Sequence, residues 1–207
     1  MGTVVLGLAG AFHPLPAGDA MERLRTIAAT GHWTLVHWSL LGAQLLVLCG
    51  YMSLAAWLDG TGQQVYLRPG AATIIVGGVL VSFNILFMTG AGPSLAAMQA
   101  SGAGEAGVAA ALFDVLHPWS LAAQRLGGVA LGGGLALYGV AIGRSGVLPR
   151  RLGQAGAAVG ALWVLTAAVS GAESLPFLAA YGLAGVWQVG VGVALLKARH
   201  RNGLSAS

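Results

Sequence analysis

Residues 69–91 read PGAATIIVGGVLVSFNILFMTGA and contain no Asp, Glu, Lys or Arg. A helix needs about 20 predominantly apolar residues to cross the hydrocarbon core of a bilayer, and this stretch is long enough to do so. Charged residues make up only 8% of the whole chain, whereas soluble domains carry about 25%. The composition therefore indicates an integral membrane protein.

Similar apolar runs recur along the 207 residues. They predict an all-α fold, a polytopic membrane helix bundle that forms a single domain over residues 1–207. Pro16 ends the first run early, so the first span is short. A secretory signal peptide is the alternative for this run, but no basic residue precedes its apolar core, as one normally would. We therefore predict six transmembrane helices, the first one short, over about 1–15, 33–58, 69–91, 119–143, 152–172 and 175–197.

Basic residues gather on one side when these spans are threaded alternately through a bilayer. Arg23, Arg25 and Arg125 fall on the other side. Basic residues are enriched in cytoplasmic loops, so the richer side is predicted to be cytoplasmic, with both termini there. Five of the six acidic residues fall on the outer side, and only Asp59 faces inward. The basic residues of the richer side are Arg68, Arg144, Arg150, Arg151, Lys197, Arg199 and Arg201.

Two outer connections have an amphipathic pattern. Asp19 and Glu22 have the spacing of a capping box, and Leu24 begins an apolar face after them. The second connection breaks near Gly102 and then sets Val108, Leu112, Val115 and Leu116 on one face. Both patterns are typical of helices that lie in the membrane interface, so we predict two exoplasmic interfacial helices.

The chain contains 34 glycines, several of them four residues apart. Such seams let helix backbones approach closely in a membrane. They are predicted to hold this bundle together, with homo-oligomer contacts as the alternative. The pairs are Gly128/Gly132, Gly139/Gly143 and Gly156/Gly160.

Polar side chains inside a membrane usually face the bundle interior or a cavity. Counting inward from the outer ends places His37, Asn84 and Arg125 at similar depths, with His117 at the mouth of the fourth span. These four are the candidate cofactor-binding residues, because a haem b needs histidine ligands and an arginine can pair with an anionic group. For Arg125 the alternatives are extension toward the interface and pairing with an acidic residue.

Histidines and a carboxylate near the outer rim suggest a divalent-metal site. Imidazole and carboxylate ligands suit zinc, copper or iron. His32 and His37 are five residues apart, about 140° around a helix with 3.6 residues per turn, so they do not face one ion together. The candidate metal ligands are His13, His32, His117 and Glu173. For each histidine the alternative is a hydrogen-bonded core residue or an interfacial residue.

The sequence gives little evidence for other kinds of site or for catalysis. The single cysteine, Cys49, excludes an intrachain disulfide, a Cys-rich zinc site and an iron–sulfur cluster. No phosphate loop or nucleic-acid module is present, and the net charge of +4 fits cytoplasmic loops. Ser170 and His117 are the residue types of an intramembrane serine protease, but the sequence pattern around the nucleophile is incomplete. No catalytic residue is assigned, and a non-enzymatic role is favoured.

Three functions stay open. The first is a non-catalytic accessory or scaffold protein, or a subunit of a membrane complex. The second is a haem b or divalent-metal protein, with electron transfer as its role. The third is a small transporter or lipid-handling protein that uses Gln44, Gln188 and Asn84 as a path near the midplane.

A short motif set also resembles a known group. His13-Pro14 ends a short first span, an amphipathic stretch follows, and Trp33-x-x-x-His37 opens the second span. This order resembles a loose group of small bacterial six-helix membrane proteins of the domain-of-unknown-function kind, over residues 1–60. The resemblance implies a bacterial plasma (inner) membrane setting and no particular activity.

Overall fold

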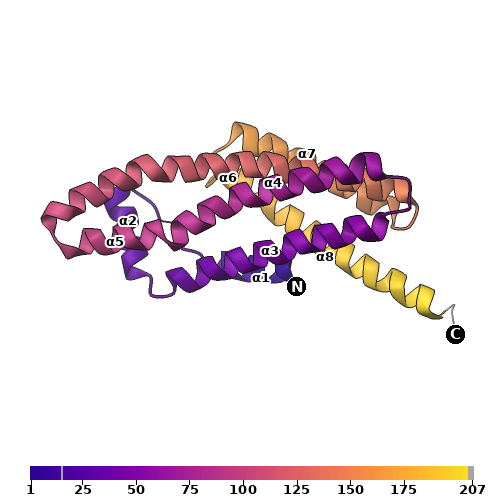
Figure 1. Cartoon of the computed structure of the whole chain (residues 1–207), viewed down its shortest axis with the longest axis horizontal. Helices are drawn as coiled ribbons and strands as arrows, with labels where there is room; N and C mark the ends of the chain where they lie inside the picture. The colour runs from indigo at the N-terminus through magenta and orange to yellow at the C-terminus, as the bar shows by residue number, and fades with distance from the viewer. Residues whose placement is uncertain (15, 205–207) are drawn as a thin grey trace.

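The computed structural model describes residues 1–14 and 16–204, with the side chains of residue 103 and of residues 199–204 excepted. The basic tail predicted at Arg199 and Arg201, with His200 between them, therefore lies outside the described side chains. The described chain is all-helical (Figure 1). Its helices are α1 (Gly2–Ala11), α2 (Ala20–Ala29), α3 (Trp33–Leu58), α4 (Gln64–Thr89), α5 (Ala91–Ser101), α6 (Ala103–Ser145), α7 (Arg150–Val169) and α8 (Leu175–Leu204).

Five helices are long and apolar enough to cross a membrane: α3, α4, α6, α7 and α8. They run alternately up and down the bundle (Figure 1). The connections at the end away from α2 are short and turn at glycines in the left-handed region, Gly60, Gly62 and Gly146, where a Cβ would be strained. These turns and the five long helices agree with the hydropathy pattern.

Large apolar side chains cover the outside of the bundle. Leu35 is 70% exposed, Val79 63% and Val186 71%. Soluble monomers rarely expose contiguous apolar patches of more than a few hundred square ångströms. An apolar outer surface on several long helices is the arrangement expected of a bundle surrounded by lipid.

The first apolar run forms only a half-length helix. α1 ends at Ala11 and has ten residues, which rise about 15 Å at 1.5 Å per residue. The hydrocarbon core is about 30 Å thick, so α1 does not cross it alone. It packs beside the first half of α3, and a Cβ on Gly2 would lie 2.8 Å from the Leu46 Cβ.

α6 is much longer than a membrane span. Its 43 residues rise about 65 Å, roughly twice the hydrocarbon thickness. The amphipathic piece predicted as a separate interfacial helix over residues 104–116 is the first part of this helix. Pro118 lies inside α6 without ending it. α5 and the first part of α6 form a helical hairpin joined at Gly102 (Figure 1).

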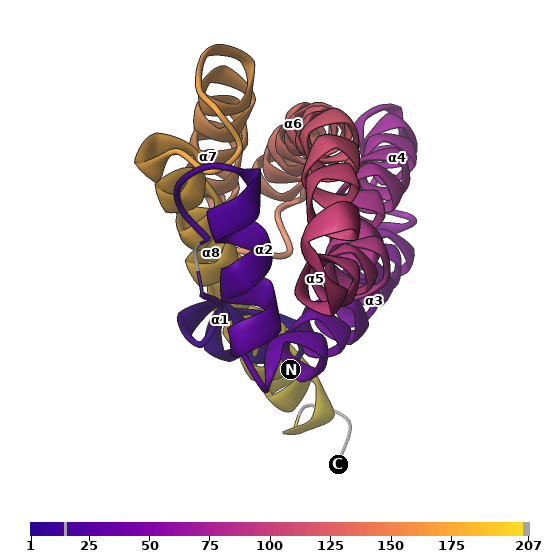
Figure 2. The same ribbon diagram turned by 90° about the vertical axis from the view of Figure 1, so that its left-hand side faces the viewer.

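α2 lies across this end of the bundle (Figure 2). Asp19 caps it, and the reciprocal bond from Glu22 completes the predicted capping box. The apolar face of α2 packs against α5 and α6, because Leu24 and Ile27 are buried in a small second core with Leu95, Ala96, Ala109 and Phe113. Protein therefore covers the face that was predicted to lie in the membrane interface. We call α2, α5 and residues 103–118 of α6 the cap.

Glycines set the spacing between the central helices. A Cβ on Gly132 of α6 would lie 2.8 Å from the carbonyl oxygen of Gly160 on α7, and one on Gly139 would meet the backbone of Gly153 and Ala157. On the other side of α6, a Cβ on Gly127 would lie 2.8 Å from the carbonyl oxygen of Gly77 on α4. The predicted seams are thus occupied by contacts within the chain.

Candidate ligand cavity at the capped end of the bundle

A cavity of about 290 Å³ lies just below the cap. We call it the upper cavity. Three of the five histidines line it, together with polar and aromatic side chains from α4, α6, α7 and α8. Its lining includes Leu6, His13, His37, Asn84, His117, Gln124, Trp163, Glu173, Phe177 and Tyr181. The sequence predicted that His13, His37 and His117 share one side of the membrane, and the structure brings them to one cavity.

His13 and His37 are in direct contact. His13 lies in the connection after α1, and its Nε2 is 3.0 Å from the Nε2 of His37 on α3. The Nδ1 of His37 is 2.8 Å from the carbonyl oxygen of Trp33. A carbonyl only accepts, so Nδ1 of His37 carries the proton and donates. Nε2 of a neutral His37 is then a bare acceptor, and His13 Nε2–H donates to it.

Trp33 fixes the orientation of this pair. Its indole N–H donates to the carbonyl oxygen of Met88 on α4, at 2.7 Å. Its ring centroid lies 4.4 Å from that of His37 and 5.6 Å from that of His13. His37 is only 2% exposed. The two imidazoles are therefore held by packing as well as by their own hydrogen bond.

Burial affects the protonation of His13, which lies beyond the end of α1. Burial lowers the pKa of His13 below its ordinary value of 6.5, while the backbone of His13 and Pro14 and the charge of Glu173 act in the opposite direction. The net direction favours a neutral ring in the folded protein.

An ionic contact closes the cavity on the side of the cap. Arg23 of α2 donates to both carboxylate oxygens of Glu173, at 3.3 and 3.4 Å. Nε2 of His117 lies 3.9 Å from the same carboxylate, and its ring stacks on Phe113 at 4.7 Å. Glu173 thus connects the α7–α8 connection to both α2 and α6.

Asn84 has a partner that the sequence reasoning missed. Its Nδ2 donates to Oε1 of Gln124 on α6, at 2.8 Å, and both residues line the cavity. Oδ1 of Asn84 has no hydrogen-bond partner in the described part of the chain. Gln124 stands beside Arg125 at the same predicted depth, so the general rule that polar intramembrane residues face inward would have found it.

Arg125 points elsewhere. It is outside the cavity lining and donates to the carbonyl oxygens of Ala167 and Ala168, at 3.3 and 2.9 Å. These carbonyls belong to the last turn of α7, where a cation is favoured by the helix dipole. Arg125 therefore holds the end of a neighbouring helix. The predicted cofactor set of His37, Asn84, Arg125 and His117 is brought together only in part, with Arg125 apart.

The predicted metal set is also divided. His32 precedes α3 and is exposed, outside the cavity that His13, His117 and Glu173 line. Among the described residues, no group of three or more His, Cys, Asp or Glu side chains is close enough to hold one metal ion.

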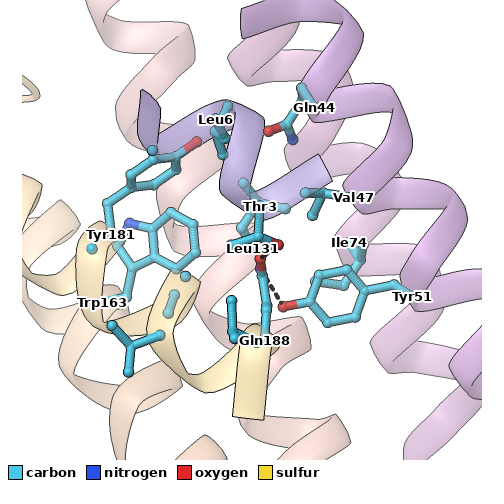
Figure 3. Close-up of a pocket in the computed structure, with 16 residues that line it drawn as sticks. Thr3, Leu6, Gln44, Val47, Tyr51, Ile74, Leu131, Trp163, Tyr181 and Gln188 are labelled. Carbon is cyan, nitrogen blue, oxygen red and sulfur yellow. Dashed lines mark hydrogen bonds between the residues drawn. The ribbon is translucent and has the colours of Figure 1, made fainter. Parts of the chain in front are cut away.

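A second cavity, of about 270 Å³, continues toward the middle of the bundle (Figure 3). We call it the middle cavity. It shares Leu6, Trp163 and Tyr181 with the upper cavity. Gln44 points into it from α3 (Figure 3) and is 2% exposed. The indole N–H of Trp163 is buried without a partner in the described chain.

A hydrogen-bond chain crosses the middle cavity. The Thr3 hydroxyl donates to Oε1 of Gln188 at 2.7 Å, and Nε2 of Gln188 donates to the hydroxyl of Tyr51 at 2.9 Å (Figure 3). This chain joins α1, α8 and α3. Gln44 and Gln188, which the sequence placed near the midplane, therefore line one cavity.

No protein-family model, curated protein or solved structure matches this chain.

Proposed function

We propose that this chain is an integral membrane protein that takes a small polar solute or ion into a path inside its helix bundle. The observation that carries the proposal is the pair of adjoining cavities. They share Leu6, Trp163 and Tyr181, and polar side chains line both. The proposal is the transport alternative of the sequence, with its path extended from Gln44 up to the histidines.

The unpaired polar groups along the path support the proposal that a solute binds there. A buried polar atom without a partner costs about 1–3 kcal/mol, so a protein seldom keeps one without a reason. Trp163 offers an unpaired donor and Asn84 an unpaired acceptor, and Gln44 presents an amide at the middle cavity. A solute with both donors and acceptors would satisfy these groups.

We further propose that the cap faces the outside of the cell and that the short loops rich in arginine face the cytoplasm. The distribution of basic residues supports this orientation. On this orientation the upper cavity lies in the outer leaflet and α1 covers only the outer half of the bundle. The bacterial plasma membrane remains the setting that the resemblance implies.

A haem b is a poorer fit for the histidine pair. Two imidazoles on opposite faces of one iron need Nε2 atoms about 4 Å apart, at bond lengths of about 2.0 Å. The Nε2 atoms of His13 and His37 are 3.0 Å apart, so an iron does not fit between them. The cavity of about 290 Å³ is also at the small end of pockets for organic ligands.

A role as a subunit of a membrane complex is a second candidate, and one observation favours it. The first part of α6 exposes an apolar stripe beyond the length that a bilayer needs. Val108 is 51% exposed, Val115 61% and Trp119 72%. A partner subunit that covers this stripe is compatible with a solute path in the bundle.

Cysteine accessibility tests the path. The single native cysteine, Cys49, is exposed and is first replaced by alanine. Gln44→Cys should then react with a small charged thiol reagent applied from the capped side, because the middle cavity admits water. The matched control is Leu45→Cys, whose side chain is 53% exposed on the lipid-facing side of the same helix and should stay unreactive.

A second variant tests the connection between the cavities. Leu6 lines both, so Leu6→Trp should slow the labelling of Gln44→Cys without affecting reagent access to the cap. If Gln44→Cys were as inert as Leu45→Cys in a folded protein, the centre would be dry and the path would be rejected.

A further inference from the structure

The upper cavity contains two imidazole nitrogens, Nε2 of His13 and Nε2 of His37, that lie close enough to bind one metal ion together. We propose that His13 and His37 bind a divalent transition-metal ion, copper(II) in preference to zinc, and that this ion is a solute of the path. The identity of the solute rests on the proposed function, but the binding of the ion by the pair does not.

The distance between the two rings supports a shared ion. Imidazole nitrogens bind first-row divalent ions at about 2.0–2.1 Å, so two Nε2 atoms 3.0 Å apart subtend an angle of about 91–97° at one ion. That is the angle between adjacent ligands of a square or tetragonal centre, which copper(II) prefers. Tetrahedral zinc would need the nitrogens about 0.3–0.4 Å farther apart at the same bond lengths.

The second ring nitrogen of His37 is already held as in a metal ligand. Metal-binding histidines almost always donate their other N–H to a carbonyl or carboxylate, which fixes the tautomer and the ring. His37 donates Nδ1–H to the carbonyl of Trp33 at 2.8 Å. Its Nε2 lone pair is thereby directed at His13 before any ion arrives.

Ion binding requires a proton shift within His13 and a tilt of the two rings, so that both Nε2 lone pairs point at the ion instead of along the line between the nitrogens. In the pair without an ion, Nε2 of His13 carries the proton that it donates to His37. On binding, that proton moves to Nδ1 of the same ring, and Nε2 becomes the second ligand. The charge of the pair does not change.

The remaining positions of the ion would face the cavity. The described residues bring no third His, Cys, Asp or Glu within ligand distance, so water or a small anion would complete the coordination. Glu173 and His117 line the same cavity and offer the next polar contacts. A site with two protein ligands releases its ion more readily than a closed four-ligand site, as a path requires.

The test uses the full chain in lipid nanodiscs, carrying an affinity tag without histidines, with Cu²⁺ itself as the probe. One ion should bind per chain, and the electron paramagnetic resonance spectrum should show hyperfine splitting from two imidazole nitrogens. His13→Asn should weaken binding by at least about 100-fold, since even the loss of a second-shell partner typically costs 10- to 100-fold.

His37→Asn should have the same effect. Because His37 is buried, its variant could fail to fold, and the variant of the half-buried His13 then decides the question. The matched control is His32→Asn, which removes an exposed histidine from the same region and should bind Cu²⁺ like the wild type.

Three outcomes would overturn the metal site: no stoichiometric Cu²⁺ in the wild type, a spectrum without two nitrogens, or unchanged binding in His13→Asn. These results are separable from the path itself. If Gln44→Cys is accessible while Cu²⁺ is not bound, the path stands with another solute. If Cu²⁺ binds while Gln44→Cys is inert, the site stands without a path.

Discussion

His13 connects two neighbouring parts of the bundle wall, the end of α1 and the first turns of α3. It follows the short helix α1, yet its ring reaches the buried His37 of α3 at 3.0 Å. The contact requires a neutral acceptor on His37 and a single proton between the two Nε2 atoms. A proton on Nε2 of His37 as well would leave two N–H groups facing each other and break this hydrogen bond.

The free energy of unfolding should therefore fall in mild acid. Burial lowers the pKa of folded His13 below the unfolded value of 6.5, so the unfolded chain binds more protons as the pH drops through 6.5. The stability is fully present above that value and is lost as the pH falls toward the folded pKa. Thermal unfolding in detergent at pH 7.5 and 5.5 measures the effect.

His13→Asn should reduce this dependence on pH, because it removes one of the titrating groups. His32→Asn, which removes an exposed histidine, should leave it unchanged. A wild-type protein that is equally stable at both pH values would contradict the neutral pair.

For single residues, the sequence predicted which side chains lie at a similar level along the bundle better than it predicted the direction in which each one points. Counting from the outer ends placed His37, Asn84 and Arg125 at one level, and His37 and Asn84 do line one cavity. Successive helical residues, however, point about 100° apart. Gln124 therefore faces the cavity while its neighbour Arg125 caps α7. Which of two adjacent polar residues faces inward depends on helix rotation, which the neighbouring helices determine.

Close contacts between glycines hold α6 against α7. Gly132 and Gly160 face each other so closely that neither leaves room for a methyl group. The spacing of four predicted such seams, but it did not predict which helices would meet. That depends on the order in which the helices pack around α6, which is set by contacts distant in sequence.

Gly132→Ala should destabilise the bundle by about 1–3 kcal/mol, the usual cost of overpacking. Its Cβ would lie 2.8 Å from the Gly160 carbonyl oxygen and 2.9 Å from the Val164 nitrogen. Gly133→Ala is the matched control, because a Cβ there has no atom within 4 Å. Unfolding in mixed micelles at increasing denaturant compares the two. Equal losses of stability would refute the seam.

The amphipathic helices show a second property that could not be predicted from the sequence. The faces of α2 and of the first part of α6 were read correctly as apolar, but the pattern does not distinguish lipid from protein as the covering. α2 packs on α5 and α6 through Leu24 and Ile27. Pro118 lies inside α6, and the helix continues through it.

For the whole molecule, hydropathy predicted the five long helices and their order, because a lipid-facing surface requires apolar residues all along a span. The length of α1 was harder to predict. Its apolar run continues to residue 15, but the helix ends at Ala11, as the nearby Pro14 and Pro16 disfavour a helical backbone before them. The cavities could not be predicted, since they arise where the half-length α1 meets α3 and α8.

The orientation in the membrane has a direct test. On the Cys49→Ala background, Ser101→Cys at the cap should react with an impermeant maleimide in intact cells. Val147→Cys, in the loop at the opposite end, should react only after the cells are permeabilised, because the proposed orientation places the loops rich in arginine in the cytoplasm. Both positions are exposed. The reverse labelling pattern would invert the proposed orientation.

The length of α6 couples movements of the cap to the rest of the bundle. One helix joins the cap to the far end of the bundle, and Pro118 sits where the two parts meet, next to His117 in the cavity wall. Proline has no N–H, so the backbone lacks one restoring bond at that point. Bending of the cap against the rest of α6 would therefore be easiest at Pro118, and the residue before it is the histidine that contacts Glu173.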